Sequence, residues 1–273
     1  MGKFSRSWQL MKTSFGILRK DKEIMIFPFL SFISCAIILI SFFAGFWFLG
    51  LSSSDSLSWL WFVVVFLIYL FLYFIVIFFN TAIIACANIR LSGGDPTVSN
   101  GLRIASQNIG RILIWALISA TIGMILQAIR QRGGWVGKLI AGVFGIAWTY
   151  VTFFIIPVLI YEKKGTASSI RRSASLFKQT WGETIIGTFG FGIVFVLLAL
   201  LGVLLVILGF LLGGTTGVII GVIIAFFYWA FIGVVASATN GIYVAALYQY
   251  ATKKQLPSEF DASLIPPTVP GFQ

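Results

Sequence analysis

The chain has 273 residues, of which 59% are hydrophobic and only 10% are charged. Charged residues make up about a quarter of an ordinary globular chain, so this composition excludes a soluble domain and predicts a polytopic membrane protein. The net charge of +11 does not indicate nucleic-acid binding, because the basic residues lie in short segments between apolar runs. In that position they orient membrane helices and contact anionic lipid headgroups.

Residues 3–20 have the pattern of an amphipathic helix that lies in the membrane interface. Their apolar residues recur in steps of four, three and four positions, at Phe4, Trp8, Met11 and Phe15. Steps of this size place the residues on one helical face, which we expect to contact the acyl boundary. The next apolar run is too long for a signal peptide, so this segment is predicted to remain attached.

Six apolar runs follow, and each is long enough to cross a bilayer, for which about 20 residues suffice. They cover approximately residues 29–50, 57–87, 111–129, 136–161, 184–212 and 216–248. Asp21 is expected to cap the start of the first. Asp95 and Pro96 are predicted to be the N-cap and first residue of a second amphipathic helix, and Thr166 or Ser168 to cap a third.

The stripe of the first helix recurs twice. One copy is Ile170, Ala174, Phe177 and Trp181, a fainter one is Val98, Leu102, Ala105 and Ile109, and a glycine follows each. We therefore predict an all-α integral membrane protein with six transmembrane helices, arranged as three hairpins that are each preceded by an interfacial amphipathic helix. Any amphipathic helix before a span gives this spacing, so whether the second copy is a true repeat is left open.

A single membrane domain is predicted over residues 1–256, with pseudo-repeats of about 1–92, 93–164 and 165–256. Residues 257–273 contain four prolines and no apolar period, which predicts an extended cytoplasmic tail. With the N-terminus inside, 16 of the 19 Lys and Arg residues lie in cytoplasmic segments, which favours cytoplasmic N and C termini. The basic loop with Arg130, Arg132 and Lys138 is an exception.

Small residues recur about every four positions in two places. They are Gly137, Ala141 and Gly145 in the fourth span, and Gly209, Gly213, Gly217 and Gly221 across the end of the fifth span and the start of the sixth. This spacing lets helix backbones approach closely. Packing within the chain is the simpler interpretation, and packing against another copy is the alternative.

The spans contain no charged residue far from their ends, which argues against proton relays and ion-coupled transport. Neutral polar residues remain. Asn80 and Asn240 lie near the predicted cytoplasmic ends of the second and sixth spans, and Thr152 lies in the fourth. Two interpretations are open: these residues line a shallow cavity, or they form hydrogen bonds between helices.

The sequence contains no histidine, and its two cysteines, Cys35 and Cys86, lie inside apolar runs without metal-ligand spacing. It also has no phosphate-binding loop, activated nucleophile or paired carboxylates. We therefore expect no enzyme activity, no cofactor and no metal.

The segment S-W-Q-L-M-K-T-S-F-G-I-L-R-K-D-K-E-I-M-I-F-P, residues 7–28, resembles the start of a family of uncharacterised prokaryotic membrane proteins with about six predicted spans. The specific matches are Ser7, Trp8, Lys12, Ser14, Asp21, Lys22, Glu23, Phe27 and Pro28. The resemblance implies a multi-pass protein of a prokaryotic cytoplasmic membrane. It implies no activity and no site.

The sequence thus favours a non-enzymatic membrane scaffold or accessory protein. Its expected partners are anionic lipid headgroups, other membrane proteins and further copies of itself, with no nucleic acid. The alternative is a passive channel or facilitator for a small neutral or anionic solute, with a cavity lined by Asn80, Thr152 and Asn240.

Overall fold

The computed structural model describes residues 3–48 and 58–253, whose regular secondary structure is entirely helical, as predicted. The elements in chain order are α1 (Lys3–Lys20), η1 (Lys22–Met25), α2 (Ile26–Phe48), α3 (Ser58–Leu91), α4 (Val98–Gln107), α5 (Ile109–Arg132), α6 (Gly134–Val151), α7 (Ile155–Pro157), the π-helical turn η4 (Val158–Glu162), α8 (Thr166–Gln179) and α9 (Trp181–Lys253). The predicted tail, residues 257–273, lies outside the described residues.

Five of these helices are long and apolar enough to cross a membrane. Their apolar stretches are Lys22–Gly45, Phe62–Leu91, Ile109–Arg132, Gly134–Val151 and Gly190–Lys253. Large apolar side chains remain exposed along them, with exposed fractions that reach 87% at Phe48 and 86% at Leu212. A water-soluble protein rarely leaves so much contiguous apolar surface uncovered, so these helices fit a multi-pass membrane protein.

The longest helix, α9, is a hairpin that turns back at Gly214. The backbone there is not helical, with φ 55° and ψ −135°, a conformation that glycine adopts far more readily than other residues. Two side chains of the second arm bond to carbonyls of the first: Tyr228 Oη donates to Leu198 O at 2.8 Å, and Trp229 Nε1 donates to Ala199 O at 2.9 Å. The two arms therefore run antiparallel in a fixed register.

The helix α3 is the centre of the molecule, because it packs against α2, α4, α5 and α9. One of its contacts with α9 joins two segments that each begin with Asn, residues 80–87 and 240–247. A Cβ atom on Gly241 would collide with Ile83, so only a residue without a side chain fits at that crossing. Ala82, Ala85, Ala238 and Ala245, which flank it, are at most 1% exposed.

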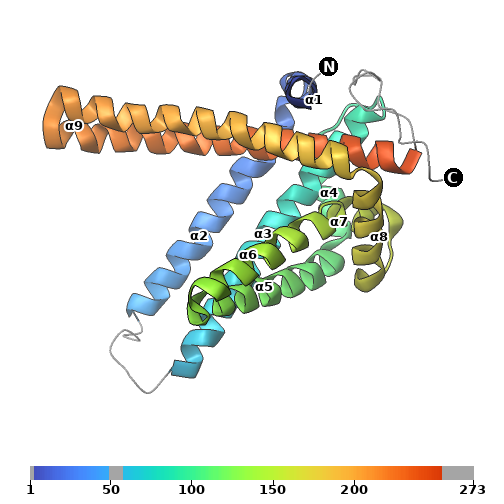
Figure 1. Ribbon diagram of the computed structural model, residues 1–273, viewed down its shortest axis with the longest axis horizontal. Helices are drawn as coiled ribbons and strands as arrows, with labels where there is room; N and C mark the ends of the chain where they lie inside the picture. Colours follow the sequence, from blue (N-terminus) through green and yellow to red (C-terminus); the bar gives the residue numbers. More distant parts are fainter. Residues whose placement is uncertain (1–2, 49–57, 254–273) are drawn as a thin grey trace.

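The other elements gather around this crossing (Figure 1). The short helices α4, α7 and α8 and the N-terminal helix α1 surround it, and both described ends of the chain lie at the same end of the molecule. We call this region the packed end. From it α2 and the α9 hairpin diverge; α2 contacts α9 through Phe32, whose ring centroid lies 6.3 Å from that of Phe226.

The predicted fourth span, residues 136–161, is not one continuous helix. Proline has no backbone N–H and its ring clashes with the carbonyl four residues earlier, so Pro157 does not fit inside a regular helix. The α-helix accordingly ends at Val151 and is followed by the short α7 and η4. The amide of Phe154, which the break releases, donates instead to Ser173 Oγ on α8 at 3.0 Å.

The helix α4 begins later than the second amphipathic helix that the sequence predicts. The N-cap of α4 is Thr97, whose side chain accepts a hydrogen bond from the Asn100 amide at 3.2 Å. Asp95 is therefore not the cap, and Pro96 is not the first helical residue. The third, α8, has Gly165 as its N-cap, so neither Thr166 nor Ser168 holds that position.

The predicted glycine series divides between two contacts. Gly209, Gly217 and Gly221 face the opposite arm of the α9 hairpin, where a Cβ on Gly209 or Gly217 would collide with the other's backbone. Gly137 lies against Ile129 O, while Ala141 is 1% exposed and Gly145 reaches only Leu126. The glycines from Gly209 to Gly221 thus keep a spacing of four although the chain turns back at Gly214. They therefore do not form a single helical face.

We predict that Gly217→Ala destabilises the α9 hairpin by about 1–3 kcal/mol, because the added methyl group overpacks the contact with Gly209. The matched control is Gly213→Ala, since a Cβ at Gly213 meets no atom within 4 Å. Thermal unfolding of both variants in detergent micelles measures the difference. Equal midpoints for the two variants would contradict the arm-to-arm packing.

Candidate functional site at the packed end

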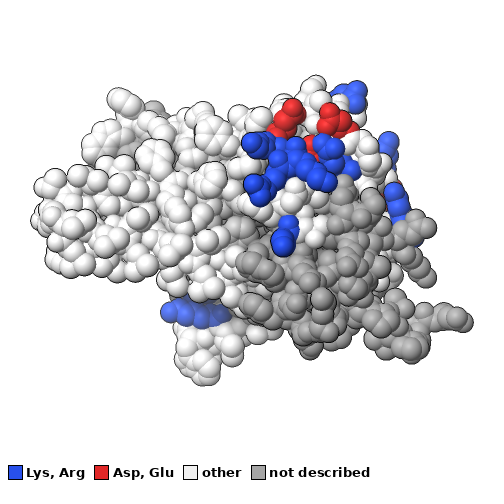
Figure 2. Space-filling view, turned by 90° about the horizontal axis from the view of Figure 1, so that it is seen from above, with Lys and Arg blue, Asp and Glu red and all other residues white. Residues whose placement is uncertain are grey.

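Charged side chains gather on the upper face of the packed end, above α1, η1 and the end of α3 (Figure 2). At the end of α3, Arg90 Nε and Nη2 both donate to the carboxylate of Asp21, and Nη2 also donates to Asp95 at 2.9 Å. The side chain of Asp21 is only 6% exposed and that of Arg90 24%. A two-point pair of this kind fixes orientation as well as distance, so it ties the segment after α1 to the end of α3.

A second carboxylate of the same segment binds α4. Glu23 Oε2 accepts a hydrogen bond from the Val98 amide at 3.0 Å. Val98 is the first residue of α4, where backbone amides lack helical partners and the helix dipole favours a negative charge. The D-K-E sequence at residues 21–23 therefore joins three elements, whereas its sequence pattern predicts only a local cap.

A neutral polar cluster joins the ends of α3 and α9. Gln249 Nε2 donates to Asn88 Oδ1 at 2.7 Å, to Asn88 O at 3.3 Å and to Ser92 Oγ at 3.2 Å. Gln249 is 5% exposed, so its amide is satisfied by protein groups in place of water. These bonds hold the crossing of α3 and α9 at its outer margin.

A third cluster surrounds Glu162, at the end of η4. Its carboxylate accepts hydrogen bonds from Lys164 Nζ at 2.6 Å and from Arg172 Nε at 2.9 Å. Burial by itself raises the pKa of Glu162, but the bonds and charges of Arg172 and Lys164 outweigh burial and leave the pKa below its ordinary value. The cluster holds α8 against the broken end of the fourth span.

The helices α1, α4 and α8 bury a face that lies beside the predicted apolar stripe, and Ala105 belongs to both. In α8 the buried residues are Ser169, Ser173, Leu176 and Thr180, in α4 and its C-cap they are Gly101, Ala105 and Asn108, and in α1 they include Ser14, Ile17 and Leu18. Small and polar residues thus face the protein together with Ile17, Leu18 and Leu176. The predicted stripe follows a neighbouring row of apolar residues and therefore does not include this face.

Large apolar residues lie beside this face. Phe15 is 43% exposed and Ile170 and Phe177 are half-buried. The side chains of Phe4, Trp8, Met11 and Trp181 lie outside the described residues.

The three polar residues predicted to line a cavity do not meet through any hydrogen bond in the described part of the chain. Thr152 Oγ1 donates to Trp148 O of its own helix at 2.7 Å. Asn240 is exposed, although it precedes the buried Gly241, and Asn80 is half-buried. The related segments around the two asparagines do meet, but through Ile83 and Gly241.

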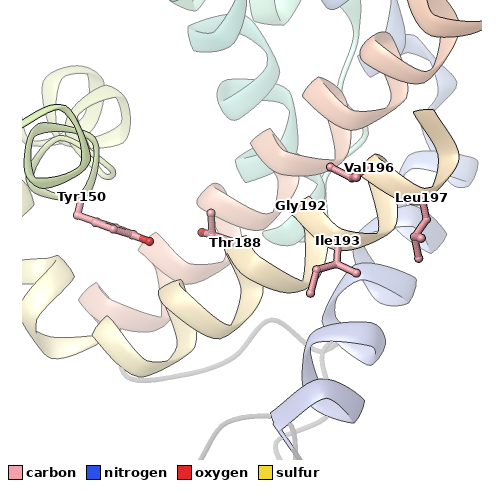
Figure 3. A pocket seen from close by; sticks show the side chains of 6 residues that line it. All are labelled: Tyr150, Thr188, Gly192, Ile193, Val196 and Leu197. Atoms are coloured by element: carbon pink, nitrogen blue, oxygen red, sulfur yellow. The ribbon is translucent and has the colours of Figure 1, made fainter. Parts of the chain in front are cut away.

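An apolar groove lies next to the packed end, between the end of α6 and the first arm of α9 (Figure 3). Its volume is about 440 Å³, and its lining residues are Tyr150, Thr188, Gly192, Ile193, Val196 and Leu197. The ring of Tyr150 also contacts Phe177 of α8, with 5.1 Å between centroids.

The described residues contain no group of three His, Cys, Asp or Glu side chains that could hold a metal ion. The carboxylates of Asp21, Glu23 and Glu162 are each occupied by a cation or a backbone amide. The polar groups described above therefore position helices relative to one another.

Residues 59–257 match a family of unknown function, DUF6159. The chain belongs to this family. The match begins after the N-terminal motif of residues 7–28 and so does not test that motif. No curated protein and no solved structure matches the chain.

We predict that Arg90→Met destabilises the protein by about 3 kcal/mol, because it leaves the buried carboxylate of Asp21 without its partner. Arg103→Met on the exposed side of α4 is the control. Thermal unfolding in detergent and the rate of proteolysis within α1 should both change for the first variant only. Identical behaviour of the two variants would show that the pair contributes nothing.

The lowered pKa of Glu162 predicts a pH dependence. A carboxyl group whose pKa is lowered on folding stabilises the protein above its ordinary pKa, and this contribution is lost as the pH falls through the folded value. Arg172→Gln removes the strongest partner, so the variant should lose less stability than the wild type as the pH falls from about 5 to about 3. Unfolding midpoints across this range measure it, and parallel curves would contradict the assignment.

Proposed function

We propose that this protein is a membrane scaffold or accessory protein that binds lipid and other membrane proteins and catalyses no reaction. The observation that carries the proposal is that polar clusters and exposed apolar side chains occupy different parts of the molecule. The described polar clusters hold the packed end together, while the diverging helices present apolar side chains such as Phe48 and Leu212 to their surroundings. Such an arrangement offers surfaces for association.

The proposed topology has six spans, with the two arms of α9 as the fifth and sixth and both termini in the cytoplasm of a prokaryote. Its support is the distribution of charge. The packed end carries the ion pairs of Asp21 and Glu162 together with the basic residues of α8. The turn between α5 and α6 lies away from this end (Figure 1).

We also infer that the three amphipathic helices are related units. Placing their stripes in register aligns Ser14 with Asn108 and Thr180, and all three are at most 7% exposed. The units differ in how they connect to the next helix. α4 and α8 lead directly into α5 and α9, whereas α1 continues to Lys20 and is separated from α2 by η1. A shared buried polar position supports repetition more strongly than the apolar spacing alone.

The alternative, a passive channel, requires polar residues that converge on one axis. The exposed position of Asn240 and the bond of Thr152 to its own helix favour the scaffold instead.

We predict that native mass spectrometry of the protein, extracted directly from its own membrane, shows retained lipid, a second membrane protein or a defined oligomer. In liposomes the wild type should pass glycerol and chloride no faster than empty vesicles do. A lone monomer that retains nothing would contradict the scaffold proposal.

The channel alternative has its own test in the double variant Asn80→Leu/Asn240→Leu, with Asn100→Leu on α4 as control. Solute flux through the wild type that the double variant abolishes and the control retains would establish the channel and overturn the scaffold proposal. Both variants must show the wild-type unfolding midpoint for the comparison to count.

A further inference from the structure

The groove between α6 and α9 has a polar end and an apolar end. Its hydroxyl groups belong to Tyr150 and Thr188, and the Tyr150 hydroxyl points toward Thr188 (Figure 3). From there the lining continues along the first arm of α9 through Gly192 and Ile193 to Val196 and Leu197. A Cβ on Gly192 would meet no atom within 4 Å, so the floor of the groove is open at that point.

The polar end of the groove lies beside a cationic helix. Phe177 of α8 contacts the Tyr150 ring, and Lys178 is the next residue. α8 contains Arg171, Arg172 and Lys178 and no acidic residue. Arg172 is paired with Glu162, whereas Arg171 and Lys178 are exposed and form no ion pair with any described carboxylate. Seven positions separate them, so they lie on the same face of α8.

The volume of the groove favours a lipid chain over a protein helix as its occupant. A volume of about 440 Å³ lies within the range of small-molecule sites. A ten-residue segment of helix with a diameter of about 10 Å occupies roughly 1,200 Å³. The groove would therefore hold less than half of such a segment of another protein's membrane span. A single extended acyl chain is narrow enough to lie along it.

We propose that this groove binds one acyl chain of an anionic phospholipid, with the phosphate near the hydroxyls of Tyr150 and Thr188 and within the field of Lys178 and Arg171. This proposal rests on the lipid-binding part of the proposed function. The acyl chains of different lipids are equally apolar, so the chain contributes little to the difference in binding free energy between one lipid and another. The headgroup therefore decides selectivity, by about fivefold for each lysine or arginine near the phosphate.

The experiment compares phosphatidylglycerol with phosphatidylcholine in nanodiscs that contain the full chain, with bound lipid counted by native mass spectrometry after detergent release. The wild type should retain one phosphatidylglycerol in preference to phosphatidylcholine. Gly192→Phe should remove that lipid, because the new ring fills the groove. Gly233→Phe is the matched control, since Gly233 is exposed on the other arm of α9 and also has no neighbour within 4 Å.

A second pair of variants tests the headgroup. Lys178→Gln should lower the preference for phosphatidylglycerol about fivefold and leave the number of bound lipids unchanged. Lys138→Gln, on an exposed residue at the start of α6, should leave the preference as it is. A loss of preference in both variants, or in neither, would show that α8 does not recognise the phosphate.

The results separate the groove from the broader proposal. If the wild type retains lipid and Gly192→Phe retains as much, the groove assignment fails and the lipid-binding function stands. If the wild type retains no lipid, oligomer or partner, both fail. If Gly192→Phe releases a second protein in place of a lipid, the groove is a protein-binding surface and the lipid assignment is wrong.

Discussion

The crossing of α3 and α9 is the contact on which the rest of the structure depends. At Gly241 the second arm of α9 comes so close to Ile83 that no side chain fits between them. In a bilayer, helices gain little from hydrophobicity when they associate, so close van der Waals contact between small residues has to supply the attraction. α4 uses the same device on α3, because Gly101 lies against Ala82 and Cys86.

Ion pairs stabilise the same region in addition to this small-residue packing. The crossing lies at the packed end, and there Asp21, Arg90 and Asp95 tie the N-terminal segment to the turn before α4. A buried carboxylate is stable only with such a partner. The N-terminal motif therefore acts through a residue 69 positions later. These contacts hold the N-terminal segment to α3 and α4.

Hydropathy predicted the helices well and their contacts poorly. The limits of α3 and α5 lie within a few residues of the predicted spans, because both are long apolar runs without an interrupting proline. Asp95 and Pro96 were misassigned because Thr97, not Asp95, caps α4. Asp21 does hold the N-cap position of η1, but its side chain makes no capping bond and pairs with the distant Arg90 instead. Such tertiary competition leaves no trace in local spacing.

The buried face of α8 is a second contact that local spacing does not reveal, and it lies near the groove. Its stripe of large residues is predicted to face the acyl boundary, and the neighbouring face, with Ser169 and Ser173, packs on the protein while Phe177 lies at its margin. Small residues bring α8 close enough for Ser173 to bond the broken end of the fourth span. Phe177 then reaches Tyr150 at the mouth of the groove. Because Lys178 follows Phe177 in the chain, the helix that closes the packed end also brings a basic segment close to the groove proposed for a lipid chain.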